Sequence, residues 1–193
     1  MTTIYFKIII LFLFLQTQVF SSGGYDNGSA VGEGNLALDF TLNPGDTVEN
    51  GQSYITWNYG FTDTIGFHGY LSHEAKGTNQ IYYGIKYTFL ENNTLDLSTA
   101  IGLRHRESET HIYLPQLLYT YKLPKNYDIG GSVVYVYDFT DSTKLGTTLD
   151  IALRIPIHLI WLNKYVSSTK LAIGAFRNAS GNIYPTYSID VKF

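Results

Sequence analysis

The sequence predicts an all-β fold: an up-and-down antiparallel transmembrane β-barrel of about ten strands, with eight or twelve strands as alternatives. Three observations lead to this prediction. Turn-forming residues recur at short, regular spacing over residues 35–193, and the segments between them alternate apolar and polar side chains. No helical periodicity interrupts the alternation. The nine turn clusters divide this part of the chain into ten strands.

The composition limits the classes of function. The chain has 193 residues and a net charge of −3, which suits a single domain and gives no reason to expect nucleic acid as a partner. It contains no cysteine, so a disulfide framework, a thiolate metal site and a cysteine nucleophile are excluded. Aromatic residues make up 16% of the chain, led by 17 tyrosines. Tyrosine has an apolar ring and a polar tip, which suits the boundary between membrane and water.

The N-terminus has the pattern of an export signal. Lys7 precedes an apolar run over residues 8–15, and polar residues begin at Gln16. The run is much shorter than the ~20 apolar residues that a membrane-spanning helix needs. We therefore predict a signal peptide over residues 1–21, with an uncleaved anchor as the alternative. Residues 22–34 are rich in Gly, Ser and Asn and predict a flexible leader before the barrel at 35–193.

Alternation gives each strand one apolar and one polar face, but it does not say which face is inside. A soluble barrel has its large apolar residues inside, whereas a membrane barrel turns them to lipid and has a polar lumen. The polar faces here carry Gly, Ala, Ser and Thr together with balanced charges, and the apolar faces carry almost no charge. Both features indicate a narrow polar lumen and an outer surface in contact with lipid.

The polar faces supply charged residues that we predict to line the lumen. If a small solute or ion passes, these residues set its charge preference. We favour the interpretation that they pair and plug the lumen, because ten strands enclose only slightly more space than eight. The predicted lumen-lining charges are Asp39, Lys86, Asp96, Arg104, Asp150, Arg154, Lys170 and Asp190.

The apolar faces carry aromatic residues near every second connection. With both termini in the periplasm, these even-to-odd connections are the periplasmic turns, and aromatics beside them predict an inner membrane girdle. Its predicted members are Trp57, Tyr59, Phe61, Tyr87, Phe89, Tyr119 and Tyr121. Tyr113, Tyr135, Tyr137 and Phe40 are predicted for the outer girdle.

The last strand resembles the C-terminal insertion signal of bacterial outer-membrane β-barrel proteins. It ends in Phe193, with Val191, Ile189 and Tyr187 at alternate positions before it. The resemblance is to the class, and no particular family is identified. It implies contact with outer-membrane lipid, recognition by the barrel-assembly machinery and a location in the outer membrane of a Gram-negative cell.

The favoured function is a structural or narrow pore-forming, porin-like protein that is not an enzyme and has no cofactor or metal. One alternative is a lipid-acting outer-membrane hydrolase that uses His105 and His111, which flank Glu107-Ser108-Glu109 at a predicted rim. However, wet rims commonly carry such residues without catalysing anything. The other alternative is a soluble, secreted ligand-binding barrel. The sequence predicts no oligomeric state.

Overall fold

A computed structural model of the chain describes residues 27–42, 52–74, 79–140, 142–159, 164–179, 181 and 183–193. These residues form ten strands and one short 3-10 helix, η2 (Pro124–Asn126), between the sixth and seventh strands. The strands are β1 (Leu36–Leu42), β2 (Gln52–Gly60), β3 (Ile65–Glu74), β4 (Asn79–Glu91), β5 (Leu95–Arg106), β6 (Glu109–Lys122), β7 (Asp128–Asp138), β8 (Lys144–Pro156), β9 (Ser168–Arg177) and β10 (Ile183–Lys192).

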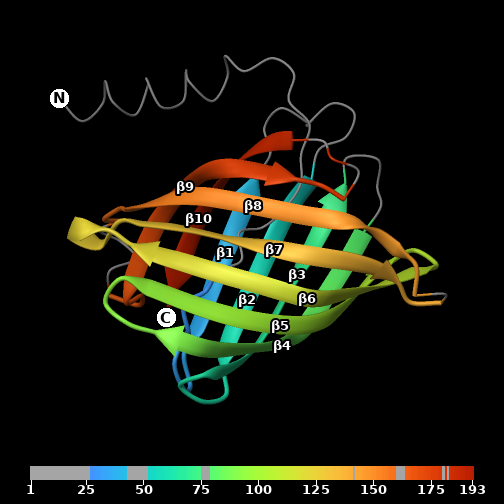
Figure 1. Cartoon of the computed structure of the whole chain (residues 1–193). Helices are drawn as coiled ribbons and strands as arrows, with labels where there is room; N and C mark the ends of the chain where they lie inside the picture. Colours follow the sequence, from blue (N-terminus) through green and yellow to red (C-terminus); the bar gives the residue numbers. More distant parts are fainter. Residues whose placement is uncertain are drawn as a thin grey trace, which may run out of the picture.

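The ten strands close into a barrel in which each pairs antiparallel with its neighbours in the chain (Figure 1). The closing seam joins β1 to β10, with Ala37 opposite Lys192 and Leu42 opposite Tyr187. At one end of the barrel the Phe193 N–H donates to the Leu36 carbonyl. We call this the proximal end and the opposite one the distal end. The predicted up-and-down barrel of ten strands is confirmed.

The two faces of the wall differ as the alternation predicts. Along β4 exposed and buried residues alternate over its first ten positions, with Ile81, Ile85 and Tyr87 among the exposed ones. Apolar residues at the middle of the wall remain open on the outside: Ile101 is 50% exposed and Ile151 is 52% exposed. The soluble ligand-binding barrel requires the opposite orientation, with the large apolar side chains inside.

The girdle aromatics lie on the outer face. Tyr59, Phe61, Tyr87, Phe89 and Tyr121 are exposed, and all are near the proximal end. The other two predicted members are half-buried because each lies over a glycine. The Trp57 ring covers Gly69, and the Tyr119 side chain crosses Gly131 and donates to the Asp150 carbonyl at 3.2 Å.

One aromatic prediction is wrong, and a β-bulge explains the error. Tyr113 was predicted for the outer girdle, but it is only 9% exposed and faces the lumen. The pairing of β6 with β5 shifts between Ala100↔Gln116 and Gly102↔Tyr113, so β6 has one extra residue there. An extra residue reverses the inside–outside alternation on one side of the bulge.

The predicted signal peptide, residues 1–21, lies outside the described residues. Of the predicted flexible leader, residues 27–34 are described, and residues 27–31 lie against the lumen wall. None of the helical segments among the described residues is both long and apolar enough to cross a membrane. The last strand places its predicted signal residues unevenly: Ile189 and Phe193 are exposed, Tyr187 is half-buried and Val191 is buried.

Candidate functional site: the barrel lumen

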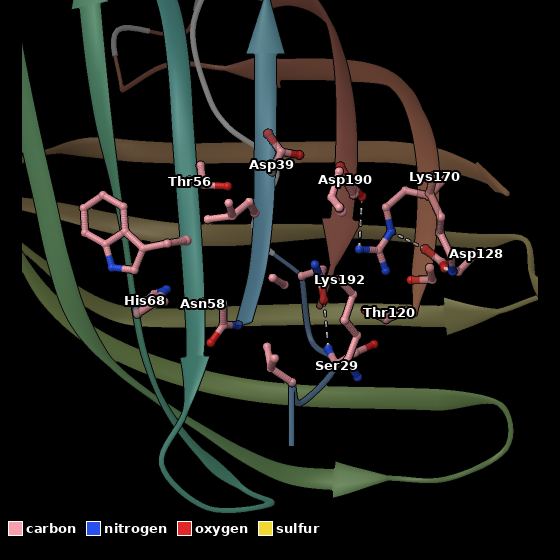
Figure 2. Close-up of a pocket in the computed structure, with 18 of the residues that line it drawn as sticks. Ser29, Asp39, Thr56, Asn58, His68, Thr120, Asp128, Lys170, Asp190 and Lys192 are labelled. Atoms are coloured by element: carbon pink, nitrogen blue, oxygen red, sulfur yellow. Dashed lines mark hydrogen bonds and ion pairs between the residues drawn. The ribbon is translucent and has the colours of Figure 1, made fainter. Parts of the chain in front are cut away.

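The lumen contains a cavity of about 860 Å³. Asn93, Tyr127 and His158 line part of it, and these residues belong to connections at the proximal end. The cavity therefore reaches the proximal end of the barrel. Its charged lining residues are Lys122, Asp39, Asp128, Asp150, Arg154, Lys170, Asp190 and Lys192, several of which face one another in Figure 2.

The leader occupies the side of the lumen formed by β4, β5 and β6. Lys86 on β4 is only 2% exposed, and its ammonium donates to the backbone carbonyls of Asn27 at 2.6 Å and Ser29 at 2.9 Å. The Ser29 hydroxyl donates to Asp96 Oδ2 at 2.8 Å. Hydrogen bonds to a charged donor are stronger than neutral ones. Lys86 is thus an anchor for residues 27–31 rather than a free charge in the lumen.

Gly28 holds the leader close to the wall. Its N–H donates to Thr120 Oγ1 at 3.1 Å, and its carbonyl accepts from the Ser98 hydroxyl at 2.6 Å. A Cβ at this position would lie 2.5 Å from the Asp96 carbonyl oxygen and 2.7 Å from Tyr119 Cα. Backbone atoms of two strands form these contacts, so no side-chain rotation relieves them. Only glycine allows this approach of the leader to the barrel wall.

A group of ion pairs lies next to the leader, on the inner face of β7, β8, β9 and β10. Asp128 on β7 accepts hydrogen bonds from Arg154 Nε through one oxygen and from Lys170 Nζ through the other. The Arg154 Nη1 atom lies 3.6 Å from Asp190 Oδ2. All four side chains are at most one-quarter exposed, so their attraction is weakly screened by water.

Two further carboxylates are held separately. Asp96 is fully buried and forms an ion pair with Lys122 at 2.7 Å. Asp150 accepts hydrogen bonds from both the N–H and the hydroxyl of Ser132. Ser132 lies where the pairing of β7 with β8 is interrupted between Gly130↔Ala152 and Val133↔Leu149. The Asp150 side chain therefore replaces part of the backbone ladder and has a structural role there.

A layer of tyrosines lies on the inner face of β2, β3, β4 and β6, towards the distal end. The Tyr54 and Tyr70 rings meet edge to face at 5.5 Å, and Tyr82 stacks on Tyr70 at 5.3 Å and on Tyr113 at 5.1 Å. The Arg104 guanidinium lies 5.5 Å from the centre of the Tyr113 ring. Offset or edge-to-face contacts of this kind each add about 0.5–1.5 kcal/mol beyond the burial of apolar area. The four rings therefore form one packed layer on the inner face of the wall.

Small inner residues make room for this tyrosine layer. Gly84 and Gly102 are opposite each other on β4 and β5, and the Tyr82 ring lies against both. The Tyr82 hydroxyl is fixed by His68 Nε2 at 2.9 Å and by the Gln116 amide at 2.7 Å. The small residues of the polar faces therefore allow aromatic side chains to fill the lumen.

The structure places all eight predicted lumen charges on the inner face, in three settings. Five lie along the cavity: Asp39, Asp150, Arg154, Lys170 and Asp190. Two, Lys86 and Asp96, contact the leader. Arg104 lies beside the tyrosine layer.

The rim histidines of the hydrolase alternative lie on opposite faces of the wall. His105 faces outward, where it stacks on Tyr83 and bonds with Thr110 at 3.0 Å. His111 faces inward and bonds with Arg104 at 2.8 Å. Because the sheet separates them, the two imidazoles do not form one site.

Three functional features were not assigned from the sequence: the binding of residues 27–31, the ion-pair centre at Asp128 and the tyrosine layer. Tyr70 and Tyr82 could have been found, because both occupy positions of the polar face in the alternation. The leader gives no such signal, since its partners come from strands far away in the sequence.

No protein-family model matches the chain, and no curated protein sequence matches it. Among solved structures it is similar to the KdgM porin, at 12% identity and a TM-score of 0.48, covering 82% of this chain and 98% of that one. It is also similar to a mutant of the Rh. blastica porin, at 13% identity and a TM-score of 0.38, with coverage of 82% and 51%. A de novo designed transmembrane β-barrel matches at 9% identity and a TM-score of 0.35, with coverage of 89% and 98%.

The closure of the sheet and the polarity of its two faces indicate the class of barrel to which the chain belongs. A sheet closed into a barrel leaves no unpaired edge, its outer face is apolar and its inner face is polar and charged. The chain therefore has the architecture of a transmembrane β-barrel.

Proposed function

We propose that this protein is a narrow channel in the outer membrane of a Gram-negative cell, with a charge-paired lumen that admits small polar solutes or ions. The observation that carries the proposal is the cavity of about 860 Å³, which is lined by charged residues and reaches the proximal end of a closed barrel.

Two features keep the proposed path narrow. Residues 27–31 occupy one side of the lumen, and the tyrosine layer fills part of its inner face towards the distal end. The ionised groups along the path are largely paired with one another, as at Asp128 with Arg154 and Lys170. Paired charges of both signs favour weak charge selectivity and passage of small species only.

In this proposal the proximal end, where the Phe193 N–H donates to the Leu36 carbonyl, faces the periplasm. The outer face contacts lipid, and the barrel-assembly machinery recognises the strand that ends at Phe193. The protein is not an enzyme in this proposal, since its rim histidines are committed to Tyr83 and Arg104 on opposite faces.

Single-channel recording of refolded protein in a planar bilayer tests the proposal. We expect small ohmic steps from the wild type and larger steps from Tyr82→Ala, which opens the tyrosine layer. Tyr83→Ala is the matched control, because Tyr83 is the next residue on β4 and is 37% exposed on the outer face. Its conductance should equal that of the wild type.

A sealed scaffold is the competing function, and the tyrosine layer is the observation in its favour. If the wild type is silent while Tyr82→Ala conducts, the layer seals the lumen and the protein is a scaffold. Silence from both variants, with folded barrels demonstrated by circular dichroism, would also contradict the channel.

A further inference from the structure

The seam where β1 meets β10 places four oxygen-bearing side chains together on the inner face. Asp39 is opposite Asp190, and two residues further along Thr41 is opposite Ser188. Alternate residues of a strand share a face, so the two pairs form neighbouring rungs. Figure 2 shows Asp39 and Asp190 on adjacent strands beside the cavity that both of them line.

The hydroxyl groups orient the two carboxylates. Thr41 Oγ1 donates to Asp39 Oδ1 at 2.5 Å, and Ser188 Oγ donates to Asp190 Oδ1 at 3.0 Å. The second oxygen of Asp190 lies 3.6 Å from Arg154 Nη1, so the second oxygen of Asp39 is the one available for another partner. Asp39 Oδ2 has none, although Asp39 is only 6% exposed. A buried carboxylate oxygen without a partner carries a large free-energy cost.

The nearby positive charges do not compensate Asp39. Arg154 donates through Nε to Asp128, and its Nη1 atom is 3.6 Å from Asp190, beyond hydrogen-bond range. Lys192, the next inward residue of β10, forms no ion pair with any carboxylate of the described residues. Two like charges directly opposite each other on a sheet destabilise it. Among the described residues, Asp190 is therefore paired with Arg154, whereas no ion pair compensates Asp39.

We propose that Asp39 and Asp190 bind a calcium ion at the closing seam of the barrel. Calcium takes six to eight oxygen ligands in flexible geometry, and two carboxylates, two hydroxyls and water from the cavity can supply such a shell. The ion bridges the first and last strands of the barrel. This seam pairs only from Ala37 to Leu42, so the ion strengthens the closure of the barrel.

Titration calorimetry of the full refolded barrel with CaCl₂ tests the site, with choline chloride as the supporting salt. We expect one ion per barrel and a Kd on the order of 0.1–1 mM, the range of weak extracellular calcium sites. Asp39→Asn and Asp190→Asn should each weaken binding at least about tenfold, as removal of a charged ligand does. Asp96→Asn is the matched control, because it removes a buried lumen carboxylate that is paired with Lys122.

A second measurement follows thermal unfolding of the same proteins with and without CaCl₂. Calcium should raise the Tm of the wild type and of Asp96→Asn, and it should not raise the Tm of Asp39→Asn. The proposal fails if the wild type shows no saturable calcium binding, or if Asp96→Asn loses binding as Asp39→Asn does. It also fails if acidification alone raises the Tm and calcium does not, since a shared proton then bridges the carboxylates. These outcomes are independent of whether the barrel conducts.

Discussion

Lys86 should control whether residues 27–31 remain bound in the lumen. Its ammonium donates two charge-assisted hydrogen bonds to backbone carbonyls of the leader, and its side chain is only 2% exposed. Lys86→Met removes both bonds and keeps most of the side-chain volume. Each hydrogen bond to a charged group contributes about 1.5–3 kcal/mol. Part of this sum is offset because the variant no longer buries a charge, so we expect a net loss of about 3 kcal/mol in leader binding.

A loss of about 3 kcal/mol corresponds to roughly a 150-fold increase in the released fraction of the leader, since 1.4 kcal/mol is a factor of ten. The chain contains no cysteine, so a single introduced thiol reports on one position only. Val31 is 8% exposed, and Val31→Cys places the thiol in the protected leader. The rate of its modification by a small water-soluble thiol reagent measures release.

We expect this rate to rise about 100-fold when Lys86→Met is added to Val31→Cys, in line with the free-energy change above. Lys170→Met is the control, because Lys170 is a lumen lysine that bonds to Asp128 instead of the leader. Its modification rate should stay near that of Val31→Cys alone. Equal rates with and without Lys86→Met would refute the anchoring role of Lys86.

Three further predictions concern other parts of the barrel. Gly28→Val should release the leader as Lys86→Met does, because a Cβ at residue 28 would lie 2.5 Å from the Asp96 carbonyl oxygen. The rate of thiol modification at Val31→Cys measures this release, and an unchanged rate would contradict the prediction. Ile151→Lys on the outer face should lower the free energy of unfolding in lipid vesicles by about 2–4 kcal/mol, whereas Ile151→Ala should lower it far less. Urea unfolding measures both variants, and equal losses would contradict contact of this residue with lipid. Asp128→Asn leaves Arg154 and Lys170 without their shared carboxylate. It should lower the free energy of unfolding by about 3–5 kcal/mol in the same assay. A loss below about 1 kcal/mol would show that these ion pairs do not stabilise the fold.

The sequence by itself predicted about ten strands and the face on which most of their side chains lie. These properties are local: a period of two between turn clusters is enough to assign Ile85 to one face and Lys86 to the other. For the same reason the charges predicted for the lumen all lie on the inner face. The one clear error, Tyr113, came from the bulge in β6, where an extra residue at Leu114-Pro115 breaks the local rule.

Only the tertiary structure decided what the inner side chains contact. Closure of the barrel brings Asp39 beside Asp190, from strands near opposite ends of the chain, and brings Asp128 to Arg154. It also brings the leader to Lys86, which the alternation assigned to the lumen lining without a partner from the leader. Such contacts depend on which strands meet across the lumen and at what height. No pattern along one strand contains that information, because the register of every strand pair contributes to it.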